Sequence, residues 1–83
     1  MGNALPSLSG LALIDVLVAD GWQVTGRSNH GAKLVKHVDG RTRITIVPTK
    51  HKRMPTGTLM AILGPKQTGL GRQGLLRIIA EHT

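Results

Sequence analysis

The alternation of apolar and polar residues along the chain predicts one helix, three strands and then two further helices. The first apolar stretch has the three- and four-residue spacing that lines one side of a helix; its apolar positions are Leu8, Leu11, Ile14, Leu17 and Val18. Ser7 or Ser9 can cap this helix, and Gly21 can end it. Trp22 follows directly and is expected to pack back on the last turn.

From Trp22 onward the spacing changes to the two-residue alternation of half-buried strands. Strands are expected at Trp22–Gly26, Ala32–Val38 and Arg41–Val47. Asp39-Gly40 predicts a tight hairpin turn between the last two, because both residues tolerate a positive φ. In the last strand one face carries Thr42, Ile44 and Ile46, and the other carries Arg41, Arg43 and Thr45. The isoleucine face is therefore predicted to be buried, and the opposite face, or its edge, to be basic.

After a basic loop, Thr56 is predicted to cap a second helix that buries Leu59, Ile62 and Leu63. Gly64-Pro65 ends it, and a short third helix is expected at Leu75, Leu76, Ile78 and Ile79. Residues 1–83 are thus predicted to form a single α+β domain. The order matches the double-stranded-RNA-binding-domain-like α-β-β-β-α sandwich, with helices on one face of a three-stranded antiparallel sheet and a short extra C-terminal helix. Many small domains share such an order, so it does not give a function by itself.

Composition limits the partners and the compartment. The 83 residues carry a formal charge of +7, which indicates a polyanionic partner: nucleic acid, an anionic membrane or an acidic protein. Trp22 is the only aromatic residue, which disfavours base stacking on aromatic platforms and leaves recognition of backbone and shape. There is no cysteine and no apolar run of about 18 to 20 residues, so a cytoplasmic protein without disulfides, thiolate metal sites or membrane segments is expected.

The candidate catalytic residue is His30, in the polar turn Gly26-Arg27-Ser28-Asn29-His30-Gly31. One interpretation is that this histidine only forms hydrogen bonds within the turn. The other is that it acts as a general acid or base in RNA cleavage, because an ordinary imidazole titrates near pH 6.5. Such cleavage takes a proton from the ribose 2′-hydroxyl or gives one to the departing 5′-oxygen, and it needs no metal or other cofactor. The histidine spacing does not resemble a zinc site either.

Basic residues near this turn and in the loop before the second helix are candidates for binding phosphate. That loop leads into a helix N-terminus, where free N–H groups suit an anion. His51, within the loop, is a candidate for phosphate binding or for a second proton carrier, although a charge run is often only a solvated face. The predicted RNA-binding residues are Arg27, Ser28, Asn29, Lys33, Lys36, Arg41, Arg43, Lys50, His51, Lys52, Arg53, Thr56, Gly57 and Thr58.

Three segments resemble the HicA family of toxins, the mRNA interferase half of a bacterial toxin–antitoxin pair. They are Asp20-Gly21-Trp22 leading to Arg27, the turn Ser28-Asn29-His30, and Val47-Pro48 followed by Gly57-Thr58-Leu59 and Ile62-Leu63. The family usually has Gly-Ser-His at the turn, so Ser28 and Asn29 differ and His30 is retained. The resemblance implies a double-stranded-RNA-binding-like fold, ribosome-independent RNA cleavage with His30 as the catalytic residue, and neutralisation by a HicB-type antitoxin.

The leading hypothesis is therefore a toxin that acts as a metal-independent endoribonuclease on mRNA or other single-stranded RNA. A non-catalytic RNA-binding module would use the same basic surface, and both would bind RNA with a steep salt dependence. Only the toxin would degrade purified RNA in the presence of a metal chelator. A third hypothesis, an interaction domain for an acidic protein, predicts no RNA affinity at physiological salt.

Overall fold

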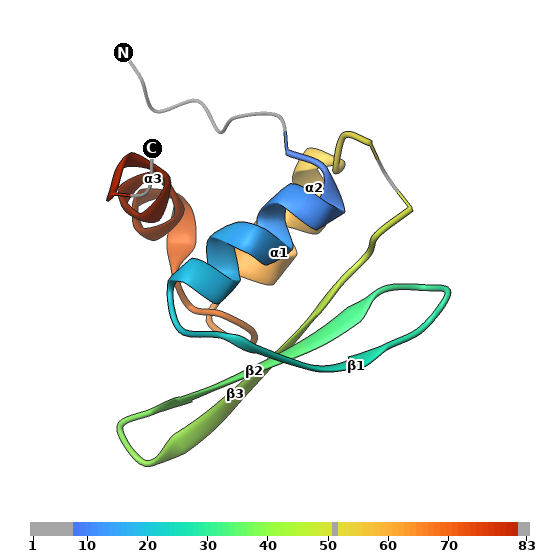
Figure 1. Cartoon of the computed structure of the whole chain (residues 1–83). Helices are drawn as coiled ribbons and strands as arrows, with labels where there is room; N and C mark the ends of the chain where they lie inside the picture. Colours follow the sequence, from blue (N-terminus) through green and yellow to red (C-terminus); the bar gives the residue numbers. More distant parts are fainter. Residues whose placement is uncertain (1–7, 51, 82–83) are drawn as a thin grey trace.

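Three helices cover one face of a three-stranded antiparallel sheet in the computed structural model, which describes residues 8–50 and 52–81 (Figure 1). The elements in chain order are α1 (Gly10–Ala19), β1 (Gln23–Arg27), β2 (Ala32–Val38), β3 (Arg41–Val47), α2 (Thr56–Leu63) and α3 (Gly71–Glu81). The strands lie in the order β1-β2-β3. The predicted α+β class, the α-β-β-β-α order and the additional C-terminal helix are confirmed. None of the helices in the described ranges is long and apolar enough to cross a membrane.

Helix α1 begins and ends at two of the predicted residues but buries a different stripe. Ser9 caps it by accepting a hydrogen bond from the Ala12 N–H at 3.0 Å, whereas Ser7 lies outside the described residues. Gly21 follows the helix with a φ of +101°. The buried face consists of Gly10, Leu13, Ile14 and Leu17. Leu11 and Val18 were expected on that face and are instead 56% and 47% exposed.

The hairpin between β2 and β3 fixes which side of β3 is buried. Asp39 and Gly40 have φ values of 53° and 77°, as the predicted turn requires. This two-residue turn pairs Leu34 with Thr45, so both side chains enter the core, with 0% and 1% of their surface exposed.

The prediction for the faces of β3 was therefore wrong. Ile44 and Ile46 lie on the outer face, 45% and 52% exposed, whereas Thr45 and Val47 are buried. The hydroxyl of Thr45 donates to the Gln67 side-chain oxygen at 2.6 Å, which satisfies this polar group in the interior. The outer face also carries Lys33, which is paired with Ile46, so it is mixed basic and apolar.

The core is aliphatic apart from Trp22 and lies between the sheet and the three helices. Helix α2 contributes Leu59, Ile62 and Leu63, as predicted. Thr56 was expected to cap this helix, but it is the first helical residue, and Pro55 stands at the N-cap without a side-chain hydrogen bond. The predicted cap is therefore wrong, and the N–H groups of the first turn have no side-chain acceptor at the N-cap.

Candidate functional site

The turn between β1 and β2 presents His30 to solvent. The Ser28 N–H donates to the Gly31 carbonyl at 2.9 Å, which closes the turn. The Ser28 hydroxyl accepts from the His30 N–H at 3.2 Å, a local side-chain bond typical of serine in turns. Asn29 and His30 are exposed at the tip. Ser28, which replaces the glycine of the resemblance, therefore contributes hydrogen bonds that hold the backbone of His30.

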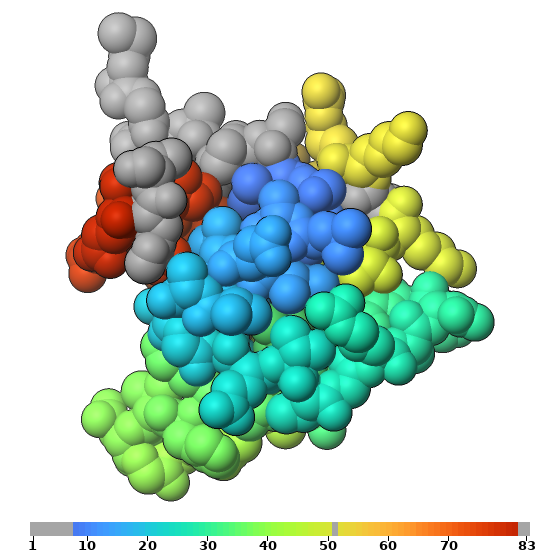
Figure 2. Space-filling model, in the orientation of Figure 1, coloured from blue at the N-terminus to red at the C-terminus, as the bar shows by residue number. Residues whose placement is uncertain are grey.

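Gly31 holds this turn against the end of β3. Its residue is buried, and a Cβ added there would lie 2.5 Å from the Val47 carbonyl oxygen and 3.2 Å from the Pro48 Cα. Only a residue without a side chain allows the two backbones to approach so closely. The turn and the segment after β3 consequently share one corner of the molecule, where Figure 2 shows them next to each other.

A hollow of about 220 Å³ lies beside the turn, lined by Gly26, Arg27, Ser28, Gly31, Lys33 and Ile46. Two of these side chains are cationic and none is acidic. Arg27 and Lys33 are both exposed and form no ion pair within residues 8–50 and 52–81. The hollow thus offers positive charge directly next to the residues that hold His30.

The basic loop after β3 approaches the same corner. Pro48 lies against Gly31, and Lys50, Lys52 and Arg53 are exposed. Met54 anchors the loop because its side chain is buried and its N–H donates to the Leu8 carbonyl at 2.7 Å. The loop then enters the first turn of α2, where Thr56 and Gly57 are exposed and Thr58 is half-buried. His51 lies outside the described residues.

The other predicted RNA-binding cations lie toward the opposite end of the sheet. Lys36 is bound to Asp20, with Nζ 3.1 Å from the carboxylate and 2.7 Å from the backbone carbonyl. Arg43 donates from Nη1 to the carbonyls of Pro65 and Gln67 at 3.1 and 3.2 Å. Arg41 is exposed at the hairpin. The structure therefore separates the predicted set into a group around His30 and a group near the hairpin (Figure 1).

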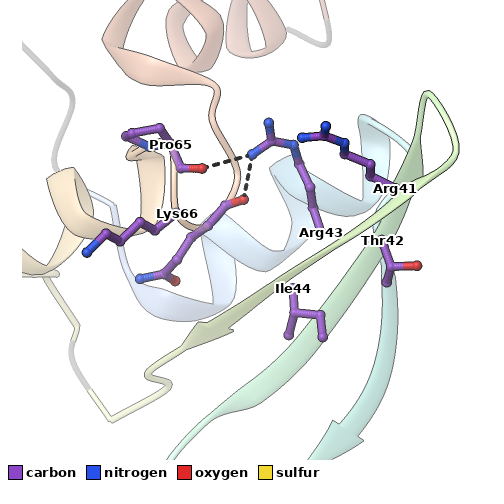
Figure 3. A pocket seen from close by; sticks show the side chains of 7 residues that line it. Arg41, Thr42, Arg43, Ile44, Pro65 and Lys66 are labelled. Atoms are coloured by element: carbon purple, nitrogen blue, oxygen red, sulfur yellow. Dashed lines mark hydrogen bonds between the residues drawn. The ribbon is translucent and has the colours of Figure 1, made fainter.

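Lys66 joins the hairpin group, although the sequence gave no reason to select it. It lies between α2 and α3, in a stretch expected to be only a turn, and it lines a pocket together with Arg41 and Arg43 (Figure 3). Only the long-range bonds from Arg43 to the neighbouring carbonyls place it there. No signal local to residue 66 indicates this position.

No group of three or more histidine, cysteine, aspartate or glutamate side chains that could hold a metal ion occurs in the described part of the chain. His37 lies on the outer face of the sheet, with Nδ1 3.0 Å from the Thr42 hydroxyl. The chemistry that the His30 corner can support is therefore proton transfer by an exposed imidazole next to bound anions.

The fold and this corner define a small basic α+β protein that presents a histidine from a β-turn beside unpaired cations. The family model described as the HicA toxin of bacterial toxin–antitoxin systems matches residues 12–70, which include the sheet, the His30 turn and α2. This span is more than half of the 83 residues, and the chain belongs to this family. Searches of curated proteins and of solved structures gave no match.

Family membership makes the chain a toxin of a toxin–antitoxin system and implies a HicB-type antitoxin as its partner. The matched span ends before α3 begins. The His30 corner therefore belongs entirely to the part of the chain that defines the family, whereas α3 lies beyond it.

Proposed function

We propose that this toxin is an endoribonuclease that cleaves mRNA or other single-stranded RNA without a metal cofactor, with His30 as general acid or base. The observation that supports this most is the position of His30. It is exposed at the tip of a turn that Ser28 and Gly31 fix against the sheet, beside a hollow with two unpaired cations. An imidazole held in this way can reach a ribose-phosphate unit that the cations bind.

The proposed reaction is attack of a ribose 2′-oxygen on the adjacent phosphorus. The new P–O2′ bond forms as the P–O5′ bond breaks, so the products are a 2′,3′-cyclic phosphate and a free 5′-hydroxyl. His30 either removes the proton of the 2′-hydroxyl or donates one to the departing 5′-oxygen. The complementary proton transfer is left to His51, a lysine or water.

Cations of the corner bind the phosphate backbone and oppose the negative charge that develops on the phosphoryl oxygens. Preorganised positive groups of this kind stabilise such transition states because they need no rearrangement during the reaction. Arg27 and Lys33 lie beside the turn, and Lys50, Lys52 and Arg53 lead into the N-terminus of α2. The uncapped first turn of that helix adds N–H donors for a further phosphate.

A non-catalytic RNA-binding module is the second candidate, and one observation favours it. The His30 ring has no hydrogen-bond partner that would orient it within residues 8–50 and 52–81, whereas many catalytic histidines are held by a carboxylate or carbonyl. A binder would use the same cations and leave the RNA intact.

Substitution of His30 by alanine separates the two candidates. Cleavage of purified RNA in the presence of a chelator, and growth arrest on induction, should fall by about 10²- to 10⁴-fold, the usual contribution of a general acid or base. His37→Ala, which changes another exposed histidine, is the matched control and should cleave like the wild type. The free energy of unfolding of His30→Ala should stay within about 0.5 kcal/mol of the wild type, because the ring is exposed.

Equal cleavage by His30→Ala and the wild type at matched concentration would remove His30 from the mechanism. RNA binding without any cleavage by the wild type would support the non-catalytic module instead.

A further inference from the structure

A second basic pocket lies at the hairpin end of the sheet. Its volume is about 390 Å³, and its walls are the first four residues of β3 and the segment 65–67 after α2. Three of the side chains that line it are cationic, namely Arg41, Arg43 and Lys66, and none is acidic. Figure 3 shows the Arg41 side chain directed toward the Arg43 guanidinium, with Lys66 across from them in the segment after α2.

Arg43 is held in place by its own chain. Its Nη1 donates to two carbonyls, of Pro65 and Gln67, and its guanidinium packs on Gly69, where an added Cβ would lie 2.8 Å from Nη1. These bonds use one nitrogen only, so the edge formed by Nε and Nη2 has no hydrogen-bond partner in the described ranges. Two parallel N–H donors on such an edge match the spacing of two phosphate oxygens.

The charges of this pocket are not compensated. Arg41 and Arg43 are two residues apart on the same strand, so their positive charges repel each other. The one ion pair within residues 8–50 and 52–81 joins Lys36 to Asp20 and does not involve them. An anion bound between the two guanidinium groups and Lys66 would remove this repulsion and use the free donors.

We propose that this pocket binds a phosphate group of the RNA several nucleotides away from the cleaved bond. The proposal rests on the proposed function, because it takes RNA to be the substrate. Ile44 and Pro65 line the same pocket and offer apolar surface for the adjacent ribose. The RNA then lies along the sheet from the His30 corner to the hairpin.

The length of β3 sets the distance between the two sites. Val47 lies next to the His30 turn, and a strand rises about 3.4 Å per residue, so Arg43 and Arg41 lie about 14 and 20 Å farther along. A nucleic acid strand stacked as in a duplex advances about 3.4 Å per nucleotide. The phosphate in the pocket is therefore about four to six nucleotides from the cleaved bond, and a trinucleotide cannot reach both sites.

The test measures binding of a fluorescent ten-nucleotide RNA and a trinucleotide to the full chain carrying His30→Ala, which keeps the RNA intact. Into this chain we introduce Arg41→Ala with Lys66→Ala, two exposed residues without intramolecular hydrogen bonds in the described ranges. The matched control is Arg72→Ala with Arg77→Ala, which removes two exposed cations of α3 outside the pocket. Both double variants change the net charge equally.

We expect the pocket variant to bind the ten-nucleotide RNA about tenfold more weakly than the control at physiological salt. The slope of log affinity against log salt should fall by about 1.4, since each lost contact with a single strand removes about 0.7. For the trinucleotide, the pocket variant and the control should bind alike.

Equal affinity of the two double variants for the ten-nucleotide RNA would overturn the pocket and leave the cleavage proposal intact. A loss confined to binding of the purified antitoxin would also overturn it, because the pocket would then recognise carboxylates of that protein. Absence of RNA binding by every protein, including the chain with His30→Ala alone, would overturn the proposed function and the pocket with it.

Discussion

The close contact at Gly31 provides the strongest test of how the His30 turn is held. In Gly31→Ala the added Cβ would lie 2.5 Å from the Val47 carbonyl oxygen, about 0.9 Å inside the 3.4 Å at which ordinary contact begins. It would also lie 3.0 Å from the Val47 carbonyl carbon and 3.2 Å from the Pro48 Cα. All three atoms belong to the backbone, so no side-chain rotation relieves the overlap, and the turn must move away from β3.

Overpacking of this kind costs about 1 to 3 kcal/mol. For a domain of this size, each kcal/mol lowers the melting temperature by about 4 to 8 °C, so a cost of about 2 kcal/mol lowers it by about 8 to 16 °C. The matched control is Gly26→Ala in β1, because nothing lies within 4 Å of a Cβ at that position. Its melting temperature should equal or slightly exceed that of the wild type, since alanine restricts the unfolded chain more than glycine does.

Thermal unfolding followed by circular dichroism measures both variants. Melting temperatures of Gly31→Ala and Gly26→Ala within about 2 °C of each other would refute the argument that this contact fixes the turn. A second readout follows from the proposed function: a displacement of about 1 Å can lower a rate by about 10²-fold, so Gly31→Ala should also cleave RNA more slowly at temperatures where it is fully folded.

Three further predictions concern stability and are measured by urea denaturation. Ser9→Ala should cost about 1 kcal/mol because it removes a helix cap, whereas Thr56→Ala should cost less than about 0.5 kcal/mol because no cap bond is lost; equal costs would contradict the assignment of the caps. Trp22→Phe should cost far less than the 3 to 5 kcal/mol of Trp22→Ala, at about 1 kcal/mol, because the buried indole N–H has no partner among the described residues. Ile44→Thr should change stability by less than about 0.5 kcal/mol and Thr45→Ala should cost about 1 to 3 kcal/mol, and the reverse order would restore the isoleucine face to the core.

Local signals in the sequence were sufficient for the elements and their order. The strand bounds of β2 and β3 were predicted to the residue, because the turn chemistry of Asp39-Gly40 and the stop at Pro48 are encoded locally. The buried face of α2 was likewise predicted, since its three large apolar residues fall on one side of the helix.

The wrong face of β3 arose from reading that strand alone. Its two faces carry similar β-branched residues, so alternation does not distinguish Ile44 and Ile46 from Thr45 and Val47. The information was nevertheless in the sequence: a two-residue turn at Asp39-Gly40 places position 45 opposite Leu34 and position 47 opposite Ala32. The buried face of β2 then decides the buried face of β3.

The candidate site was predicted in part for the same reason. The exposure of His30 at the tip of a serine-containing turn follows from local chemistry, whereas the separation of the basic residues into two groups depends on the length of the strands. The association of Lys66 with Arg41 and Arg43 depends on contacts between residues more than 20 positions apart, since the bonds of Arg43 span 22 and 24 positions. Whether these cations bind RNA stays a prediction.

The attachment of segment 65–67 to β3 also protects the molecule from self-association. A free edge strand can pair with another chain and begin an aggregate. On one edge, Arg43 and Thr45 fasten this segment beside β3. On the other, β1 is only five residues long and is interrupted by an irregularity between Val24 and Gly26, which disfavours continuous pairing. A toxin stored at high concentration with its antitoxin can therefore be released without presenting an open template for fibril growth.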